Sequence, residues 1–112
     1  MADGLGPTIS THVLDTERGQ PAEGIRVTLF RLDVPNAPIR MTQALTDGDG
    51  RIRDLLERPL VGGDYRLEFD LGRERDAFFR RVTVDLRIAD PGRSYHVPLL
   101  LAPYSMTTYR GS

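Results

Sequence analysis

Short runs in which apolar and polar residues alternate are the feature that most constrains the fold of this chain. In residues 82–88, valine, leucine and isoleucine occupy every second position, and threonine, aspartate and arginine lie between them. Residues 25–30 and 65–70 show the same period of two. Clusters of turn-forming residues separate the runs, such as Asp-Gly-Asp-Gly at 47–50 and Asp-Pro-Gly at 90–92. This pattern is typical of β-strands that bury one face and expose the other.

The same reasoning applied to the whole chain predicts about eight short strands. They are expected at residues 8–14, 25–30, 40–46, 51–53, 65–70, 82–88, 94–101 and 106–110. Many short strands with regular turns in a chain of 112 residues predict a sandwich or a barrel of the all-β class. At most one short helical turn is expected, in residues 71–78, where charged residues favour helix over strand.

Length and composition narrow the classes of function. The chain is long enough for a single domain, residues 1–112, with one modest core, and residues 1–7 are expected to be flexible. A net charge of -1 gives no electrostatic basis for binding nucleic acid or an anionic membrane. The chain has no cysteine, which excludes disulfides and thiol chemistry, and no apolar run long enough to span a bilayer. No segment has the pattern of a secretory signal, so we expect a cytoplasmic protein.

The chain has two histidines, His12 and His96, and both fall on predicted strands. If Val13 points into the core, alternation directs His12 outward, onto the same kind of surface as His96. A structural zinc site needs about four nitrogen or sulfur ligands, so no metal site is expected from two histidines. A lone histidine on a strand is more often structural than catalytic, and the sequence alone does not place these two side by side.

Residues 95–102 differ from the other predicted strands because both of their faces are mostly apolar. Tyr95, Val97 and Leu99 alternate with His96 and with a second apolar set, namely Pro98, Leu100 and Ala102. A strand that is apolar on both sides is usually covered on both sides. In a two-layer sandwich of this size, another copy of the chain is the expected second cover, which predicts an oligomer.

Two further segments carry residues suited to chemistry. The Asp-Gly-Asp-Gly run at 47–50 looks like part of a calcium loop, but it lacks the later glutamate and is better explained as a tight turn. Arg51, which follows it, is either an exposed strand residue or a ligand for a planar oxyanion. The last four residues, Tyr-Arg-Gly-Ser at 109–112, are either a frayed end or part of a site.

Three segments together resemble a known family of enzymes. They read ISTHVLDTERGQPAEGIRVTLFRL, TDGDGRI and YHVPLLLAPYSMTTYRGS, and they resemble the 5-hydroxyisourate hydrolases, the enzymatic relatives of transthyretin. The hormone carrier shares the fold and the Pro-Tyr-Ser stretch but lacks both histidines and the terminal Tyr-Arg-Gly-Ser. This chain has all of these residues, so it is more similar to the enzymes.

The resemblance implies a transthyretin-like β-sandwich of two four-stranded sheets. It also implies a homotetramer, built as a dimer of dimers, whose central channel holds the active sites. The catalytic residues that it implies are His12, Arg51, His96 and Ser112, and the substrate-binding residues are His12, Arg51, Tyr109 and Arg110. No cofactor and no metal are implied, and the expected partner besides other copies of the chain is a small-molecule substrate.

The implied reaction is hydrolysis of 5-hydroxyisourate to 2-oxo-4-hydroxy-4-carboxy-5-ureidoimidazoline, a step in urate degradation. Which histidine acts as the general base stays open at this point. One alternative is a non-enzymatic transthyretin-like protein that binds a small flat anion, and another is a purely structural sandwich module. A carrier has no need for the whole set of His12, Arg51, His96 and the terminal tetrapeptide.

Overall fold

The computed structural model describes residues 6–34, 36–72 and 77–111. These residues form nine strands and no helix. The strands are β1 (Ile9–Asp15), β2 (Gln20–Pro21), β3 (Arg26–Arg31), β4 (Ile39–Leu45), β5 (Arg51–Ile52), β6 (Gly63–Asp70), β7 (Arg81–Ile88), β8 (Tyr95–Leu101) and β9 (Met106–Thr108). The all-β class expected from the alternation is confirmed.

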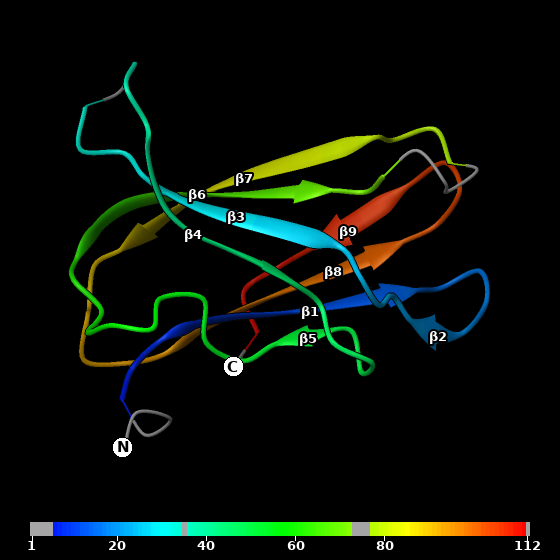
Figure 1. The fold of residues 1–112 in the computed structure, drawn as a ribbon, viewed down its shortest axis with the longest axis horizontal. Coiled ribbons are helices and arrows are strands. Elements are labelled where there is room, and N and C mark those ends of the chain that lie inside the picture. Colours follow the sequence, from blue (N-terminus) through cyan, green and yellow to red (C-terminus); the bar gives the residue numbers. More distant parts are fainter. Residues whose placement is uncertain (1–5, 35, 73–76, 112) are drawn as a thin grey trace.

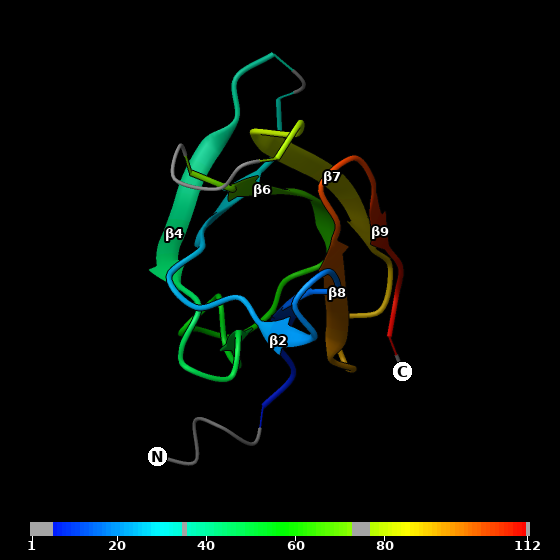
Figure 2. The same ribbon diagram turned by 90° about the vertical axis from the view of Figure 1, so that its right-hand side faces the viewer.

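The strands form two sheets that face each other across a shared core (Figures 1 and 2). One sheet has the order β4-β3-β6-β7, and the other has the order β2-β1-β8-β9, with β5 also paired to β1. The first of these is the expected four-stranded sheet. The second has one strand more than expected, because the two-residue β2 pairs with Leu14 and Asp15 at the end of β1.

The core lies between the sheets and follows the period of two. In β1, the buried residues alternate with half-buried ones along the whole strand, and β6 shows the same alternation from Tyr65 to Asp70. Val13, Leu29, Leu67, Phe69 and Leu99 are fully buried. Burial of one such side chain stabilises the fold by about 1.5–3 kcal/mol, so the core residues hold the two sheets together.

The expected helical turn in residues 71–78 falls partly outside the described residues, because 73–76 are not described. Residues 71, 72, 77 and 78 are not helical. Residues 1–5 of the segment expected to be flexible also lie outside the described residues. In the part of the chain that the structure describes, there is no helix long and apolar enough to cross a membrane.

β1 and β8 are parallel, whereas the other strand pairs of the two sheets are antiparallel. Their register runs from Ile9 beside Tyr95 to Asp15 beside Leu101. The hydroxyl of Thr11 donates a hydrogen bond of 2.6 Å to the carbonyl of Val97 inside the core. This pairing brings the beginning and the later part of the chain side by side in the middle of one sheet.

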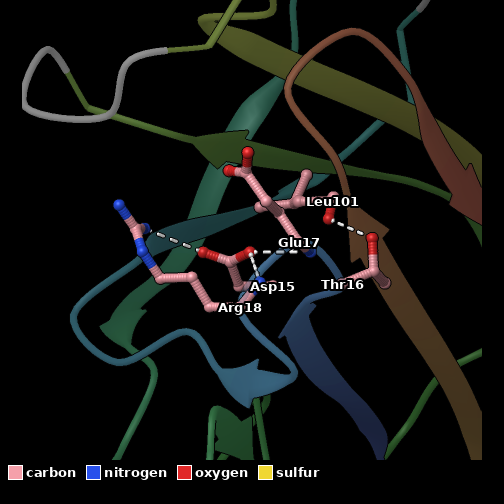
Figure 3. Close-up of polar contacts among 5 residues, drawn as sticks. All are labelled: Asp15, Thr16, Glu17, Arg18 and Leu101. Atoms are coloured by element: carbon pink, nitrogen blue, oxygen red, sulfur yellow. Dashed lines mark hydrogen bonds and ion pairs between the residues drawn. The ribbon is translucent and has the colours of Figure 1, made fainter.

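The loop after β1 fixes this parallel register (Figure 3). Both the amide and the hydroxyl of Thr16 donate to the carbonyl of Leu101, at 2.8 and 2.7 Å. The buried carboxylate of Asp15 accepts the amides of Glu17 and Arg18, and the Arg18 guanidinium lies 3.0 Å from its other oxygen. These hydrogen bonds join the loop to the end of β8, and they stabilise the register between β1 and β8.

The outward face of β6 and β7 carries a series of ion pairs across the two strands. The pairs are Asp64 with Arg87 at 3.5 Å, Arg66 with Asp85 at 2.7 Å and Glu68 with Arg81 at 3.7 Å. We call this surface the charged face. The acidic and basic side chains alternate along both strands, so this side of the sandwich is suited to contact with water.

Candidate active site

Both histidines lie on the outward face of the sheet that contains β1 and β8. Ile9, Thr11 and Val13 are buried in β1, and the alternation directs Ser10 and His12 to the opposite side. His96 is half-buried between the buried residues of β8. The prediction that both imidazoles face outward is confirmed. We call this surface the histidine face.

The register brings Arg51 and the two histidines into neighbouring positions. His12 lies beside Arg51 of β5 on one side and beside Pro98 of β8 on the other. Ser10, two residues earlier on the same face of β1, lies beside His96. Because adjacent strands are about 4.8 Å apart, these side chains occupy one small area of the sheet. The pairing of β1 with β5 and β8 therefore places His12, Arg51 and His96 close together, although they are far apart in the sequence.

A hydrogen bond links His96 to β1. The Ser10 hydroxyl and the Nδ1 atom of His96 are 2.9 Å apart. This contact fixes the direction of the imidazole ring relative to the sheet. Ser10 was not predicted as a site residue, although its position two residues before His12 places it on the same face.

His12 is also fixed by a neighbouring strand. Its Nε2 atom lies 2.9 Å from the backbone carbonyl oxygen of Asp49, in the turn that precedes Arg51. The turn was predicted from its residues, but this contact was not, because every residue type has the same backbone carbonyl. Each ring therefore has one nitrogen held by the protein and a second nitrogen outside these two hydrogen bonds.

The C-terminal segment lies along β8 and reaches His96. The amide of Gly111 donates a 2.7 Å hydrogen bond to the carbonyl of His96. A Cβ atom at position 111 would lie 2.9 Å from Cδ2 of the imidazole, so the backbone of Gly111 packs directly on the ring. Ser112 lies outside the described residues. Of the described residues in this segment, Gly111 is in contact with His96.

Tyr109 and Arg110 fall on different sides of the sheet. The register of β8 with β9 and with Gly111 places Tyr109 opposite Pro98, on the histidine face, where the tyrosine is 55% exposed. The same register places Arg110 opposite the buried Val97. Both Tyr109 and Arg110 line a hollow between β7 and the C-terminal segment. By the strand register alone, Tyr109 shares the face of the histidines and Arg110 does not.

The electrostatic environment favours a neutral His96. Partial burial lowers the pKa of His96 below its ordinary value of about 6.5, and the electrostatic effects of Arg51 and then of His12 lower it further. A neutral imidazole at pH 7 is able to accept a proton. The described residues contain no group of three or more histidine, cysteine, aspartate or glutamate side chains placed to hold a metal ion.

An all-β sandwich with two imidazoles and a guanidinium on the outward face of one sheet defines a transthyretin-like protein with a polar site. The family model described as HIUase/Transthyretin family matches residues 9–111. This chain belongs to the HIUase/transthyretin family.

Individual relatives agree with this assignment. The 5-hydroxyisourate hydrolase of Salmonella typhi is 40% identical over 119 residues, which cover 100% of this chain and 87% of that protein. The solved 5-hydroxyisourate hydrolase of Klebsiella pneumoniae is 35% identical, with a TM-score of 0.82 over 95% of this chain and 99% of that one. Sea bream transthyretin, solved in complex with thyroxine, is 27% identical, with a TM-score of 0.81 over 92% and 93% of the two chains.

Proposed function

We propose that this chain hydrolyses 5-hydroxyisourate to 2-oxo-4-hydroxy-4-carboxy-5-ureidoimidazoline, a step in urate degradation. The observation that carries the proposal is the grouping of His12, Arg51 and His96 on one outward face of a transthyretin-like sandwich. Relatives named for this reaction are about 40% identical over nearly the whole chain. In the reaction, water adds to a ring carbonyl and an amide C–N bond breaks.

A neutral imidazole supplies the base that the reaction needs. The lowered pKa of His96 keeps this ring uncharged at pH 7, and Ser10 holds its direction. A positioned general base accelerates such a step by about 10²–10⁴-fold. The second imidazole is suited to return a proton to the leaving ring nitrogen. Either imidazole is suited to be the base, and the other then serves as the acid.

Arg51 is suited to bind the oxygen on which negative charge develops. Its guanidinium offers two parallel N–H groups to a carbonyl or enolate oxygen, and such charge-assisted bonds are stronger than neutral ones. Donors already in place at a developing oxyanion lower the barrier without reorganising during the reaction. Tyr109, opposite Pro98, is suited to stack on the flat ring of the substrate.

Ser112 and Arg110 remain expectations from the family resemblance. Ser112 would follow Gly111, which packs on His96, and its hydroxyl would hold a histidine or the attacking water. Arg110 falls on the other side of the sheet from His12, so a direct contact with substrate in the same chain would require its side chain to bend round the sheet edge.

We further propose that the active protein is a homotetramer, a dimer of dimers, in which the histidine face of one copy meets that of another. The support is the apolar character of this face beside the polar site, where Leu14 and Leu100 occupy half-buried outward positions. A second copy over this surface would exclude water and strengthen the electrostatic contacts of Arg51. The expected cytoplasmic location also stays a prediction.

A carrier of small flat anions is the second candidate, because sea bream transthyretin in complex with thyroxine has nearly the same fold. His12, Arg51 and His96 favour the hydrolase, since a carrier needs no general base. The test is the ultraviolet absorbance of freshly generated 5-hydroxyisourate, with and without the protein. We expect faster decay with the protein, unchanged by dialysis against a chelator. A rate equal to that in buffer, with retained binding of urate, would support the carrier instead.

A further inference from the structure

The turn between β4 and β5 is organised by one carboxylate. The Oδ1 atom of Asp47 accepts the amides of Asp49 and Arg51, at 2.8 and 3.0 Å. The backbone of Asp47 closes the same turn, because its carbonyl accepts the amide of Gly50 and its own amide donates to the carbonyl of Arg51. These four bonds determine the path of the chain from residue 47 to residue 51.

Gly50 allows this turn to approach β1 closely beside His12. Its carbonyl accepts the amide of Val13 at 2.7 Å, and its φ of 75° lies in the left-handed region that glycine tolerates. A Cβ atom at this position would lie 2.4 Å from the carbonyl oxygen of Val13. The close approach therefore depends on the absence of a side chain, and it brings the carbonyl of Asp49 within reach of the neighbouring His12.

The other end of the turn is anchored in the core. Thr46, the residue before Asp47, is buried, and its hydroxyl donates to the carbonyl of Ala22 and accepts the amide of Ile25. The turn therefore has little freedom to move as a unit. A change in its internal hydrogen bonds is expected to alter the position of the Asp49 carbonyl rather than to shift the whole segment.

The contact between this carbonyl and His12 selects one form of the imidazole. A backbone carbonyl accepts hydrogen bonds and has no proton to donate, so the Nε2 atom of His12, 2.9 Å away, must carry the hydrogen. In the neutral ring, the lone pair is then on Nδ1. The turn thus determines which atom of His12 is available to exchange protons with a substrate.

We propose that Asp47 is a positioning residue of the site: its carboxylate shapes the turn so that the Asp49 carbonyl holds His12 in the Nε2–H form, with Nδ1 free to accept a proton. The catalytic consequence rests on the proposed hydrolase function, whereas the form of the ring does not. The same carboxylate accepts the amide of Arg51, so one side chain aligns both the imidazole and the guanidinium.

Asp47 has two properties that variants can separate. The amide of Arg51, followed by the amide of Asp49 and the guanidinium of Arg53, lowers the pKa of Asp47, so it is charged at pH 7. Its Oδ2 atom lies 3.2 Å from that guanidinium. Asp47→Asn retains an oxygen acceptor at Oδ1 and removes the charge, whereas Asp47→Ala removes both. If hydrogen bonding positions His12, the asparagine variant must resemble the unaltered protein.

The first experiment is ¹⁵N NMR of the histidine rings in the full chain at pH 7.5. The chain has two histidines, so the His96→Gln variant assigns the remaining signals to His12. We expect the unaltered protein and Asp47→Asn to show a protonated Nε2 and an unprotonated Nδ1 in His12. We expect Asp47→Ala to show a mixture of the two neutral forms. A protonated Nδ1 in the unaltered protein would overturn the proposal without any variant having to fold.

The second experiment is the decay assay with 5-hydroxyisourate. Asp47→Ala is expected to lower kcat by between about 10-fold and 100-fold, with a smaller change in KM, because a misplaced group costs about this much. Asp47→Asn is expected to stay close to the unaltered rate. The matched control is Asp70→Ala, which removes a similar turn-capping carboxylate from the opposite sheet, where Asp70 accepts the amide of Gly72.

The two readouts separate the two proposals. An inactive unaltered protein with a protonated Nε2 in His12 would refute the hydrolase function and leave the positioning of the ring supported. Equal kcat losses in Asp47→Ala and Asp70→Ala, with the ring form unchanged, would overturn the role of Asp47. So would an Asp47→Asn variant as slow as Asp47→Ala with the Nε2–H form intact, since the charge and not the turn would then matter.

Discussion

The two outward faces of the sandwich are built from the same kind of strand but present opposite chemistry. The charged face carries arginines and carboxylates at most outward positions of β6 and β7, as in the pair of Arg66 with Asp85. The histidine face carries Pro98 and Leu100 beside His12 and His96. Exposed ion pairs are well solvated and contribute little to stability. The charged face is therefore suited to remain in water, and the histidine face is suited to be covered.

The two faces also differ in what holds their polar side chains. On the charged face, each side chain is held by another flexible side chain across the strands. On the histidine face, His12 is held by the Asp49 carbonyl, and Gly111 packs on His96. Backbone groups cost little further ordering, since the hydrogen bonds of the turn at 47–50 and the bridge from Gly111 to His96 already fix them. The difference shows how a regular sheet surface becomes a site of defined geometry.

The largest expected effect contrasts the two faces through one arginine on each. Arg51→Gln is expected to slow hydrolysis of 5-hydroxyisourate by at least about 100-fold, because one oxyanion donor contributes about 10²–10³-fold. His12→Ala and His96→Ala are expected to lose a similar factor. Arg66→Gln, which breaks the ion pair with Asp85, is expected to leave the rate nearly unchanged. If Arg51→Gln and Arg66→Gln lowered the hydrolysis rate equally in the absorbance assay, the two faces would not differ in function.

Assembly is expected to respond to a charge on one face and not on the other. Leu100→Arg places a charge on the outward side of β8 and is expected to reduce the mass of the particle in solution below that of four chains. Thr83→Arg on β7 adds the same charge to the charged face and is expected to leave the mass unchanged. Light scattering after gel filtration measures both. A tetramer that survives Leu100→Arg would show that the histidine face is not the interface.

A smaller effect is expected from one methyl group at position 111. Gly111→Ala places a Cβ atom 2.9 Å from Cδ2 of His96, so the ring must move, and we expect kcat to fall by about 10-fold. The control is Gly6→Ala, because a Cβ atom at position 6 meets no other atom within 4 Å. Comparable kcat values for the two variants would mean that the packing of the C-terminal segment does not position His96.

The smallest expected effect is a shift in proton binding at His96. Because burial and the charges of Arg51 and His12 lower its pKa in the folded chain, the unfolded chain binds more protons at this ring in the range below about pH 6.5. The contribution of a neutral His96 to the free energy of unfolding is therefore complete above about pH 6.5. It is lost as the pH falls through the lowered pKa of His96 in the folded chain. NMR titration is expected to give a midpoint below 6.5, and a higher one in Arg51→Gln. A midpoint that does not move would exclude an effect of Arg51 on this ring.

Much of the fold was predictable because each strand carries its own alternation. The expected strand at 82–88 differs from β7 by one residue, and the outward placement of His12 and His96 followed from the same period. β2 was not predicted, since Gln20 and Pro21 are both exposed and too few to show a pattern. Their pairing with the end of β1 arises from the loop between them, which local alternation does not report.

The sequence predicted which side chains belong to the site, but not their proximity or the backbone groups that hold them. His12, Arg51 and His96 were identified, but their proximity depends on the parallel register of β1 and β8, which pairs residues 86 positions apart, as in the bond from Ser10 to His96. The carbonyl of Asp49 and the amide of Gly111 are backbone groups, so no residue type marks them. Arg110 differs from these backbone groups, because the family resemblance predicted it as a substrate-binding residue. The strand register places it on the side of the sheet away from the histidines.

The parallel pairing of β1 with β8 also determines when activity becomes possible as the chain is made. β1 leaves the ribosome early, but its central partner cannot pair with it until residues 95–101 have been synthesised. Until then, Ile9 and Val13 lack one of the strands that pack beside them in the finished sheet. Contacts of such long sequence separation form slowly, because a long stretch of chain must be closed first. A shortened translation product that lacks β8 would therefore be inactive, and the apolar residues of its β1 would be exposed to chaperones.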